Sequence, residues 1–255
     1  MLAAQRQQRI LDMVLKSGAI STARVARALA ISEETARKDF ELLEAGGLLS
    51  RKHGGVVRHD DHRRDLSLDS REITNVAEKK AIAALALEQI HAGDTVFFDA
   101  SSTVFYLASM LPNVEIIALT TALKVAIELA RRPAIQVILS GGIVGHGSLS
   151  CNPDFDSTIL ERCHVQKAFL SCRGVDAGRG LSEASAEHAA VKRKVVALAD
   201  QIILLADNSK IGLKSSWFFA KLTDVDLLIT DRKPNSTVIR TLNRGGGKAI
   251  FARGR

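Results

Sequence analysis

The segment at residues 20–40 constrains the fold of this chain more than any other. Its helical apolar pattern stops at Ile31-Ser32, and a second helical segment starts at once. Ser32 is placed as an N-cap, and the two acids after it fall in the first turn, where the helix dipole favours them. Two short helices joined by so tight a turn predict a helix-turn-helix, whose second helix enters the DNA major groove. This pattern alone predicts a protein that reads DNA.

The flanking residues complete a small module. Its three helices are predicted over residues 3–17, 22–30 and 33–45. A β-hairpin is predicted to follow, because two short apolar runs flank the basic tip Lys52-His53-Gly54-Gly55. We therefore predict a winged helix-turn-helix DNA-binding domain over residues 1–58.

The candidate DNA contacts lie in the first turns of the two helices and at the tip of the wing, since these parts reach base edges and phosphates. They are Ser21, Thr22, Ser32, Glu34, Thr35, Arg37, Lys38, Arg51, Lys52 and His53. Arg37 suits either a bidentate contact with guanine or a phosphate contact. Phe40, Leu42 and Leu43 are predicted to be core residues. The alternative is a winged helix that binds a protein partner and has a solvated basic face.

Charge and composition are compatible with this prediction. The 255 residues carry a net charge of +7, and residues 2–58 hold ten bases against six acids. A modest positive charge suits a polyanionic partner but does not identify one. The start of the chain lacks the apolar core of a signal peptide, and no apolar run reaches the roughly 18–20 residues that span a bilayer. We expect a cytoplasmic protein that makes no membrane contact.

The rest of the chain predicts a second domain of the α/β class. Residues 59–74 are charged and poor in apolar side chains, so they are predicted to be a linker. Over residues 75–255 buried strands alternate with helices, and residues 249–251 are predicted as an edge strand. Apolar strands between helices favour a mostly parallel sheet covered on both faces. Such sheets bind ligands at the carboxyl ends of their strands.

Hydroxyl groups, glycines, acids and a lysine follow several of these strands. The candidate ligand-binding residues are Asp99, Ser101, Ser102, Thr103, Thr120, Thr121, Gly141, Gly142, Gly174, Asp176 and Lys210. Backbone N–H groups and hydroxyls at a helix start suit a phosphate, and Lys210 supplies a point charge. Together they predict a polar, anionic ligand such as a sugar phosphate. Taken alone, serines at a strand end are equally explained as ordinary helix caps.

Several motifs resemble the DeoR family of bacterial transcription regulators over nearly the whole chain. Residues 7–57, which contain LLEAGGLLSRKHGG, resemble its DNA-binding module. The motifs GDTVFFDASST, SGGIVG, RGVDAGRGLSEASAEHAAVKR and LADNSKIG resemble its sensor domain, which is similar in fold to ribose-5-phosphate isomerase and the CoA-transferase-like group.

The resemblance implies a repressor of a carbohydrate-catabolic operon that a phosphorylated sugar releases from its operator. It also implies that the effector is surrounded by the turns at residues 99–103, 141–142, 174–176 and 208–210. The expected partners are double-stranded operator DNA, the phosphorylated sugar effector and further copies of the chain in a homodimer or homotetramer. We expect no cofactor, no metal and no catalytic residue. An activator is not separated from a repressor by sequence.

An enzyme is the alternative from another class, namely a sugar-phosphate isomerase that carries a DNA-binding module. Such an enzyme needs a carboxylate and a lysine beside a carbonyl group, and Asp99, Asp176, Glu183, Glu187 or Lys210 would have to supply them. Glu183 and Glu187 stand four residues apart, a helical spacing at which both are predicted to be exposed.

The three cysteines do not indicate a disulfide framework, because their number is odd and they occur late in the chain. Cys151, Cys163 and Cys172 are predicted to be buried thiols. Two alternatives stay open at this point. Cys163 and His164 with the other cysteines would form a zinc site, although no Cys-x-x-Cys pair is present. Cys172 beside Arg173 would be a redox sensor if its pKa were depressed.

Overall fold

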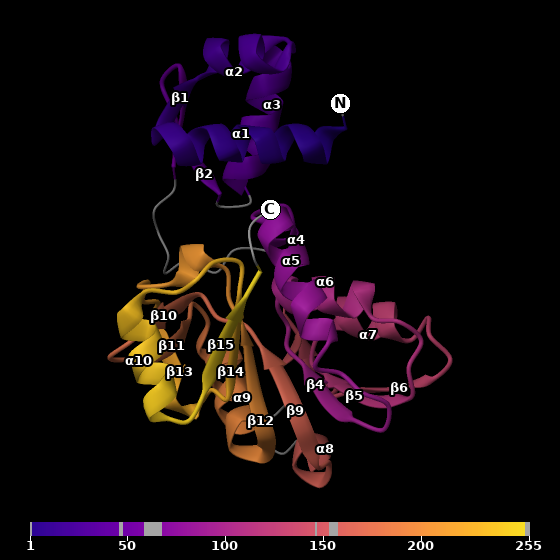
Figure 1. The fold of residues 1–255 in the computed structure, drawn as a ribbon. Helices are drawn as coiled ribbons and strands as arrows, with labels where there is room; N and C mark the ends of the chain where they lie inside the picture. The colour runs from indigo at the N-terminus through magenta and orange to yellow at the C-terminus, as the bar shows by residue number, and fades with distance from the viewer. Residues whose placement is uncertain (1, 46–47, 59–67, 146, 153–157, 253–255) are drawn as a thin grey trace. The chain divides into compact units, whose positions relative to one another are not determined.

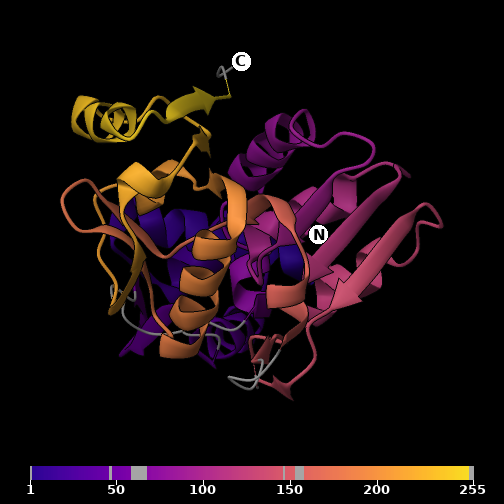
Figure 2. The same cartoon turned by 90° about the horizontal axis from the view of Figure 1, so that it is seen from below.

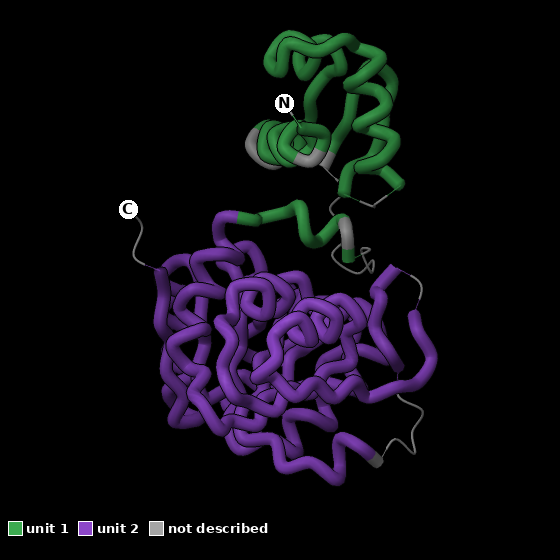
Figure 3. Tube along the Cα trace, turned by 90° about the vertical axis from the view of Figure 1, so that its right-hand side faces the viewer, with its two compact units in different colours: residues 1–76 green, residues 77–255 purple. Residues whose placement is uncertain are grey.

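The computed structural model describes residues 2–45, 48–58, 68–145, 147–152 and 158–252. These residues divide into two compact units, Met1–Val76 and Ala77–Arg255 (Figure 3). Within the predicted linker at 59–74, residues 59–67 lie outside the described residues and Leu68–Glu72 form the short helix α4.

The first unit is a winged helix-turn-helix (Figure 1). Its elements are α1 (Ala3–Ser17), β1 (Ala19–Ser21), α2 (Thr22–Leu29), α3 (Glu33–Ala45), β2 (Leu49–Lys52) and β3 (Gly55–Arg58). The sequence did not predict β1, which pairs antiparallel with β3 and makes the wing a three-stranded sheet. The tight turn between α2 and α3 places Ala30 in the left-handed region at φ 52°, and the N–H of Ile31 bonds to the carbonyl of Ala26.

The core of this unit lies where α1 and α3 face the wing. Ile10 and Val14 of α1 are buried with Phe40 and Leu43 of α3. The prediction that Leu42 is a core residue was wrong, since its side chain is 63% exposed. Residues three apart share a helix face, so Phe40 and Leu43 point inward together, whereas Leu42 is rotated away from them.

The second unit is built on a seven-stranded parallel sheet, as the α/β prediction requires. Its strands in spatial order are β15 (Lys248–Phe251), β14 (Leu227–Thr230), β12 (Ala199–Leu205), β9 (Val165–Leu170), β4 (Thr95–Phe98), β5 (Ile116–Thr120) and β6 (Ile135–Leu139). The helices of this part are α5 (Val76–Leu87), α6 (Ser102–Met110), α7 (Leu123–Leu129), α8 (Thr158–Arg162), α9 (Ala186–Leu198) and α10 (Ser236–Arg244). Two short 3-10 helices, η1 (Asn208–Lys210) and η2 (Leu222–Asp224), complete it. The predicted edge strand at 249–251 is confirmed as part of β15, which lies beside α10 (Figures 1 and 2).

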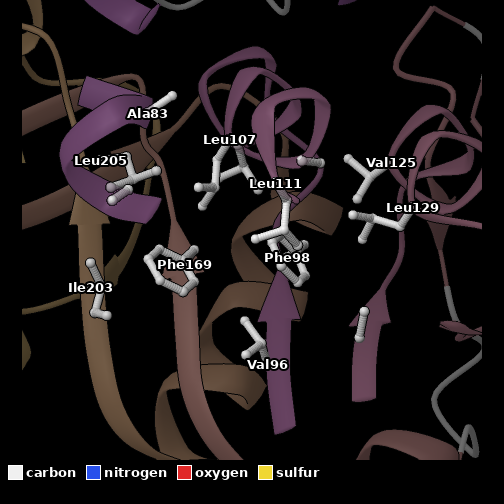
Figure 4. Packing of buried hydrophobic residues seen from close by; sticks show 14 of the residues in the cluster. Ala83, Val96, Phe98, Leu107, Leu111, Val125, Leu129, Phe169, Ile203 and Leu205 are labelled. Atoms are coloured by element: carbon white, nitrogen blue, oxygen red, sulfur yellow. The ribbon is translucent and has the colours of Figure 1, made fainter. Parts of the chain in front are cut away.

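Both faces of this sheet are buried, and neighbouring residues of one strand serve opposite faces. Phe98 of β4 and Phe169 of β9 stack at 6.0 Å between ring centroids, on the face that α5, α6 and α7 cover (Figure 4). Phe97 and Leu170 belong to a second core cluster, which includes residues of α9 and α10. This two-sided burial explains why the strands are rich in apolar residues.

The short antiparallel strands of the second unit were not predicted. β10 (Gly174–Asp176), β11 (Gly180–Glu183) and β13 (Trp217–Ala220) form a small sheet, and β7 (Ile143–Val144) pairs with β8 (Cys151–Asn152). Gly180 has φ +94°, and a Cβ there would lie 2.1 Å from the carbonyl oxygen of Ala220, so the close approach of β11 and β13 requires glycine. Across the described ranges, no helix is both long enough and apolar enough to span a bilayer.

Truncating Phe40 tests the core of the first unit. Phe40→Ala leaves a cavity under the recognition helix and should cost about 3–5 kcal/mol of unfolding free energy. The matched change Leu42→Ala removes an exposed side chain and should cost under about 0.5 kcal/mol. Amide hydrogen exchange in α1–α3 reports the unfolding free energy of the first unit separately from that of the second unit. If both substitutions accelerated amide exchange in α1–α3 equally, the assignment of the core would be contradicted.

Candidate DNA interface and effector site

The recognition helix α3 begins as the sequence predicted. The Oγ of Ser32 accepts a hydrogen bond from the backbone N–H of Thr35 at 3.1 Å, so Ser32 is its N-cap. The same Oγ lies 2.9 Å from the Oγ1 of Thr35. Ser21 caps α2 in the same way, through the N–H of Arg24. The hydroxyl of Thr22 donates to the carbonyl of Gly54 at 3.2 Å and is buried, so it joins α2 to the turn of the wing.

The two cations of the recognition helix each face an acid one turn earlier. Arg37 lies 2.8 Å from Glu33, and Lys38 lies 3.0 Å from Glu34. All four side chains are about half exposed or more. Exposed pairs at this spacing stabilise a helix by only a few tenths of a kcal/mol, so a DNA phosphate or base can replace the acid at small cost.

Arg51 anchors the wing to α3. Its guanidinium bonds to Glu44 at 2.6 Å and to Glu41 at 2.9 Å, and its backbone N–H donates to Glu44 at 2.7 Å. These bonds lower the pKa of Glu44 and raise that of Arg51. Lys52 and His53 at the tip are exposed. Of the predicted wing contacts, Arg51 is therefore occupied within the module, whereas Lys52 and His53 face solvent.

A buried ion pair that the sequence did not predict holds α3 against α1. Arg6 of α1 bonds to both carboxylate oxygens of Asp39, whose side chain is 3% exposed. The hydrogen bond to Asp39 raises the pKa of Arg6. Asp39 stands between Ala36 and Leu43 on the inward face of α3, and an acid in that apolar stripe was the available signal.

At the carboxyl end of β4, Asp99 joins a buried charge cluster. Its Oδ2 lies 2.8 Å from the Nζ of Lys192 and accepts the N–H of Ser171 at 3.0 Å. Lys192 also donates to Glu183 and to the carbonyl of Ser171, each at 2.6 Å. Burial opposes the charge of Lys192, but the two carboxylates outweigh it and raise the pKa of the ammonium group.

Lys210, predicted as a phosphate contact, lies at the same edge of the sheet. Its Nζ donates to the Oγ of Ser171 at 2.9 Å and lies 3.8 Å from Asp207. Asp207 is buried, which raises its pKa, yet Lys210, the bonds from Ser209 and the charge of Lys79 lower it overall. Asp99 and Lys210, 111 positions apart in the numbering, thus meet at Ser171.

The start of α6 contributes hydroxyls to this edge. Ser101 caps the helix by accepting the N–H of Val104 at 3.3 Å. Ser102 and Thr103 are buried. Among the described residues, the Oγ1 of Thr103 finds no hydrogen-bond partner. A buried hydroxyl without a partner costs roughly 1–3 kcal/mol, which a ligand acceptor would recover.

The ends of β5 and β6 meet beside α6. The hydroxyl of Thr120 donates to the carbonyl of Phe98 at 2.7 Å and accepts the N–H of Ala122 at 3.0 Å, so it is used within the sheet. The carbonyl of Thr120 accepts the N–H of Ser140 at 3.0 Å, which places the start of the Gly141-Gly142 turn next to it. Both glycines have positive φ. The Thr121 carbonyl accepts the N–H of Cys151 at 2.7 Å.

Asp176 serves its own hairpin. It accepts the N–H groups of Gly178 and Arg179 at 3.1 and 2.8 Å and faces Lys214 at 3.3 Å. Burial raises its pKa, but these partners lower it overall. Gly174 is required where it stands, because a Cβ there would lie 2.5 Å from the carbonyl oxygen of Leu213. The contacts seen in the described ranges do not join Asp176 to Asp99 or Lys210.

The expectation that Glu183 and Glu187 are both exposed was wrong for Glu183. Glu183 is the last residue of β11 and is buried, because α9 starts only after the Ser185 cap. It therefore does not share an exposed helix face with Glu187. Burial raises the pKa of the Cys172 thiol to about 12, so the alternative of a depressed pKa is contradicted. Cys151 and Cys172 are buried as predicted, whereas Cys163 is half-buried.

The remaining polar groups do not form a metal centre. His164 bonds to Asp200 at 2.8 Å, and the described part of the chain holds no group of three metal-ligating side chains. His188 of α9 lies 2.9 Å from the Oγ of Ser150, and both residues are buried.

Sequence reasoning missed Lys192, which organises the cluster, and did not include Ser171 or Asp207 among the candidate ligand-binding residues. Lys192 stands on the buried face of α9 between Ala189 and Val195. A lysine within a stripe of apolar residues at helical spacing signals a buried partner, because an unpaired ammonium group is too costly there.

Comparison with known proteins agrees with both units. Residues 6–62 match the DeoR-like helix-turn-helix domain, and residues 74–232 match the DeoR C-terminal sensor domain. The chain is 40% identical to the HTH-type transcriptional regulator YulB of Bacillus subtilis, over 95% of this chain and 94% of that protein. It is 35% identical to the HTH-type transcriptional repressor GlcR of the same organism, over 96% and 95%.

Among solved structures, ribose 5-phosphate isomerase A of Methanocaldococcus jannaschii resembles 54% of this chain and 55% of that chain, with 16% sequence identity and a TM-score of 0.41.

A winged helix-turn-helix module followed by an α/β sensor unit defines a DNA-binding transcription regulator. The chain belongs to the DeoR family. The earlier resemblance to this family is thereby confirmed. The roles of the individual site residues stay predictions, and substitutions test them.

Two substitutions separate base reading from phosphate binding. Arg37→Ala should reduce the preference for the chain's own operator over unrelated duplex by roughly 5- to 150-fold, because a bidentate base contact is worth roughly 1–3 kcal/mol of discrimination. Lys52→Ala should weaken binding to all duplexes alike and reduce the salt slope by about one. Titrations at several salt concentrations measure both. Equal losses on every sequence for both variants would contradict this division.

Removing Lys192 tests the buried cluster. Lys192→Met leaves Asp99 and Glu183 buried without their cation, and should lower the unfolding free energy by about 3–5 kcal/mol. The matched variant Lys194→Met breaks an exposed pair with Glu161, worth about 0–1 kcal/mol. Urea unfolding compares the two. If Lys192→Met were as stable as Lys194→Met, the cluster would not hold this edge together.

Proposed function

We propose that this regulator represses a carbohydrate-catabolic operon and that a phosphorylated sugar, bound at the Asp99–Lys192–Lys210 edge of the sensor unit, releases it from DNA. Family membership supports regulation, and the similarity to the transcriptional repressor GlcR supports repression. The observation that carries the effector proposal is the convergence of Asp99 and Lys210 on Ser171 beside the start of α6.

The two kinds of group at this edge suit the two halves of a sugar phosphate. Lys210 and the N–H groups at the start of α6 suit the phosphate. The acceptor oxygens of Asp99 suit sugar hydroxyl donors, and the unpartnered Oγ1 of Thr103 offers one more polar contact. Thr121 and the Gly141-Gly142 turn follow β5 and β6 and extend the same rim.

Repression would require an even number of copies. A helix-turn-helix protein reads paired half-sites, and a homodimer or homotetramer places two recognition helices at the required spacing. Effector binding would change how these modules are presented to the two half-sites. Light scattering of the purified chain reports the number of copies, and a monomer at operator-binding concentration would remove this part of the proposal.

A panel of sugar phosphates tests the effector. A true effector should stabilise the protein by RT ln(1 + [L]/Kd), about 2.7 kcal/mol at a hundredfold excess over Kd. It should also change the fluorescence of Trp217, the chain's single tryptophan, which lies opposite Glu183 on β13. The readouts are thermal unfolding, emission, and release of a labelled operator.

Two variants, each with one lysine changed to glutamine, serve this experiment. Lys210→Gln should bind operator normally but lose stabilisation and release. Lys194→Gln changes a half-exposed lysine that pairs with Glu161 and should respond as the native chain does. Normal induction of Lys210→Gln would exclude Lys210 from the site.

A reporter gene that loses expression when the regulator is deleted would show activation in place of repression. Turnover of a sugar phosphate by the purified protein would favour an isomerase.

A further inference from the structure

The positive charge of the chain lies at its two ends. Residues 2–58 carry ten bases against six acids, and residues 231–255 carry seven bases against one acid. The residues between them hold 18 bases and 21 acids. For its length, the end of the sensor unit is therefore more basic than the DNA-binding module.

Five of these terminal cations are described, and all are exposed. We define the C-terminal basic patch as Arg232, Lys233, Arg240, Arg244 and Lys248. The first two precede α10, the next two lie on it, and Lys248 opens β15, which packs beside α10 (Figures 1 and 2). Arg240 and Arg244 are four residues apart, about 6 Å along the helix axis, and share one face. Arg253 and Arg255 lie outside the described residues.

The cations of the patch differ from those of the DNA-binding module in their partners. Arg37 and Lys38 each face a glutamate, and Arg51 faces two. In the patch Arg232 lies 3.3 Å from Asp231. For the other four cations, no ion pair with a carboxylate of the described residues is seen.

Local structure does not explain this arrangement. A cation in the last turn of a helix is favoured by the dipole, which accounts for Arg244. Lys233, however, precedes the N-cap Asn235, at the end where the dipole disfavours a cation. Arg240 and Arg244 lie on one face of α10 without an acid paired to them among the described residues, and the resulting positive field suits an external polyanion.

We propose that the C-terminal basic patch is a second DNA-contacting surface, which binds the phosphate backbone of the duplex without reading its sequence. Arginine and lysine side chains that face phosphates release condensed counterions, and this favours binding to any sequence. The patch would add affinity and register to the recognition made by α3, since phosphate contacts position and base contacts specify. The chain already belongs to a DNA-binding family, so the required polyanion is its established class of partner.

The salt dependence of duplex binding by the full chain tests this proposal. The probe is a labelled mixed-sequence duplex of about 40 base pairs, or ~136 Å at 3.4 Å per base pair, long enough for two contact regions. Each phosphate contact adds about 0.9 to the slope of log K against log salt, so Arg240→Gln/Arg244→Gln should reduce its magnitude by about 1.8. Anisotropy titrations at several salt concentrations give the slope.

The control removes the same charge from cations that already have partners. Arg131→Gln/Lys194→Gln breaks exposed pairs with Glu128 and Glu161 and should leave the slope as in the native chain. All four residues are exposed or half-exposed, and a thermal transition matching the native chain verifies folding of each variant. An unchanged slope in the Arg240/Arg244 variant would overturn the proposal, and so would an equal fall in the control.

Discussion

The buried ammonium group of Lys192 is the constraint on which the sensor unit depends. A charge in the interior is tolerated only when opposite charges and hydrogen bonds replace the water it has lost. Asp99 and Glu183 supply the charges, and the carbonyl of Ser171 supplies the remaining acceptor. Asp99 follows a strand of the large sheet and Glu183 ends a strand of the small one, so a single ammonium group from α9 fixes three elements to one another.

The DNA-binding module uses the same solution on a smaller scale. The Arg6–Asp39 pair joins α1 to the inward face of α3, where apolar residues already pack. Apolar contacts are non-directional and tolerate small rotations, whereas a bidentate guanidinium–carboxylate pair is directional. The rotation of α3 decides which side chains face the groove. Such a pair therefore constrains the part of the module that has to be placed most accurately.

The sequence predicted the features of the fold that depend on local residue patterns, such as buried strands and helix caps. The strands from Thr95 and Ile116 are almost entirely apolar because both faces of the sheet are covered. Ser32 caps α3 because caps act within three residues. The antiparallel β1 has only three residues, and its partner β3 lies far along the chain, so no local pattern marks it. Candidate residues were found at strand ends, because topology brings these ends together.

What the sequence could not provide is the pairing between distant polar groups. Ser171 and Asp99 are 72 residues apart, and nothing in the vicinity of either indicates the other. Lys210 was expected to face a ligand, and the structure adds that it already bonds to Ser171. Asp176 shows the converse, since its place at a strand end suggested a ligand and its carboxylate closes a turn. The sequence predicts that a polar residue lies at the end of a strand. Only the tertiary structure shows which groups form hydrogen bonds or ion pairs with it.

Charge balance in this cluster bears directly on the proposed effector. The buried acids Asp99, Glu183 and Asp207 are matched by the buried or half-buried Lys79, Lys192 and Lys210, so the cluster is neutral without a ligand. A phosphate group adds about two negative charges at neutral pH. In a site of low dielectric these charges are tolerated only if N–H dipoles point at them or a cation changes its partner. Lys210 is well placed to do so, because it bonds a hydroxyl and its Nζ stands 3.8 Å from the carboxylate of Asp207. A ligand that draws Lys210 away from Ser171 would disturb the residue on which Asp99 and Lys192 also depend, and this gives binding a direct route into the sheet.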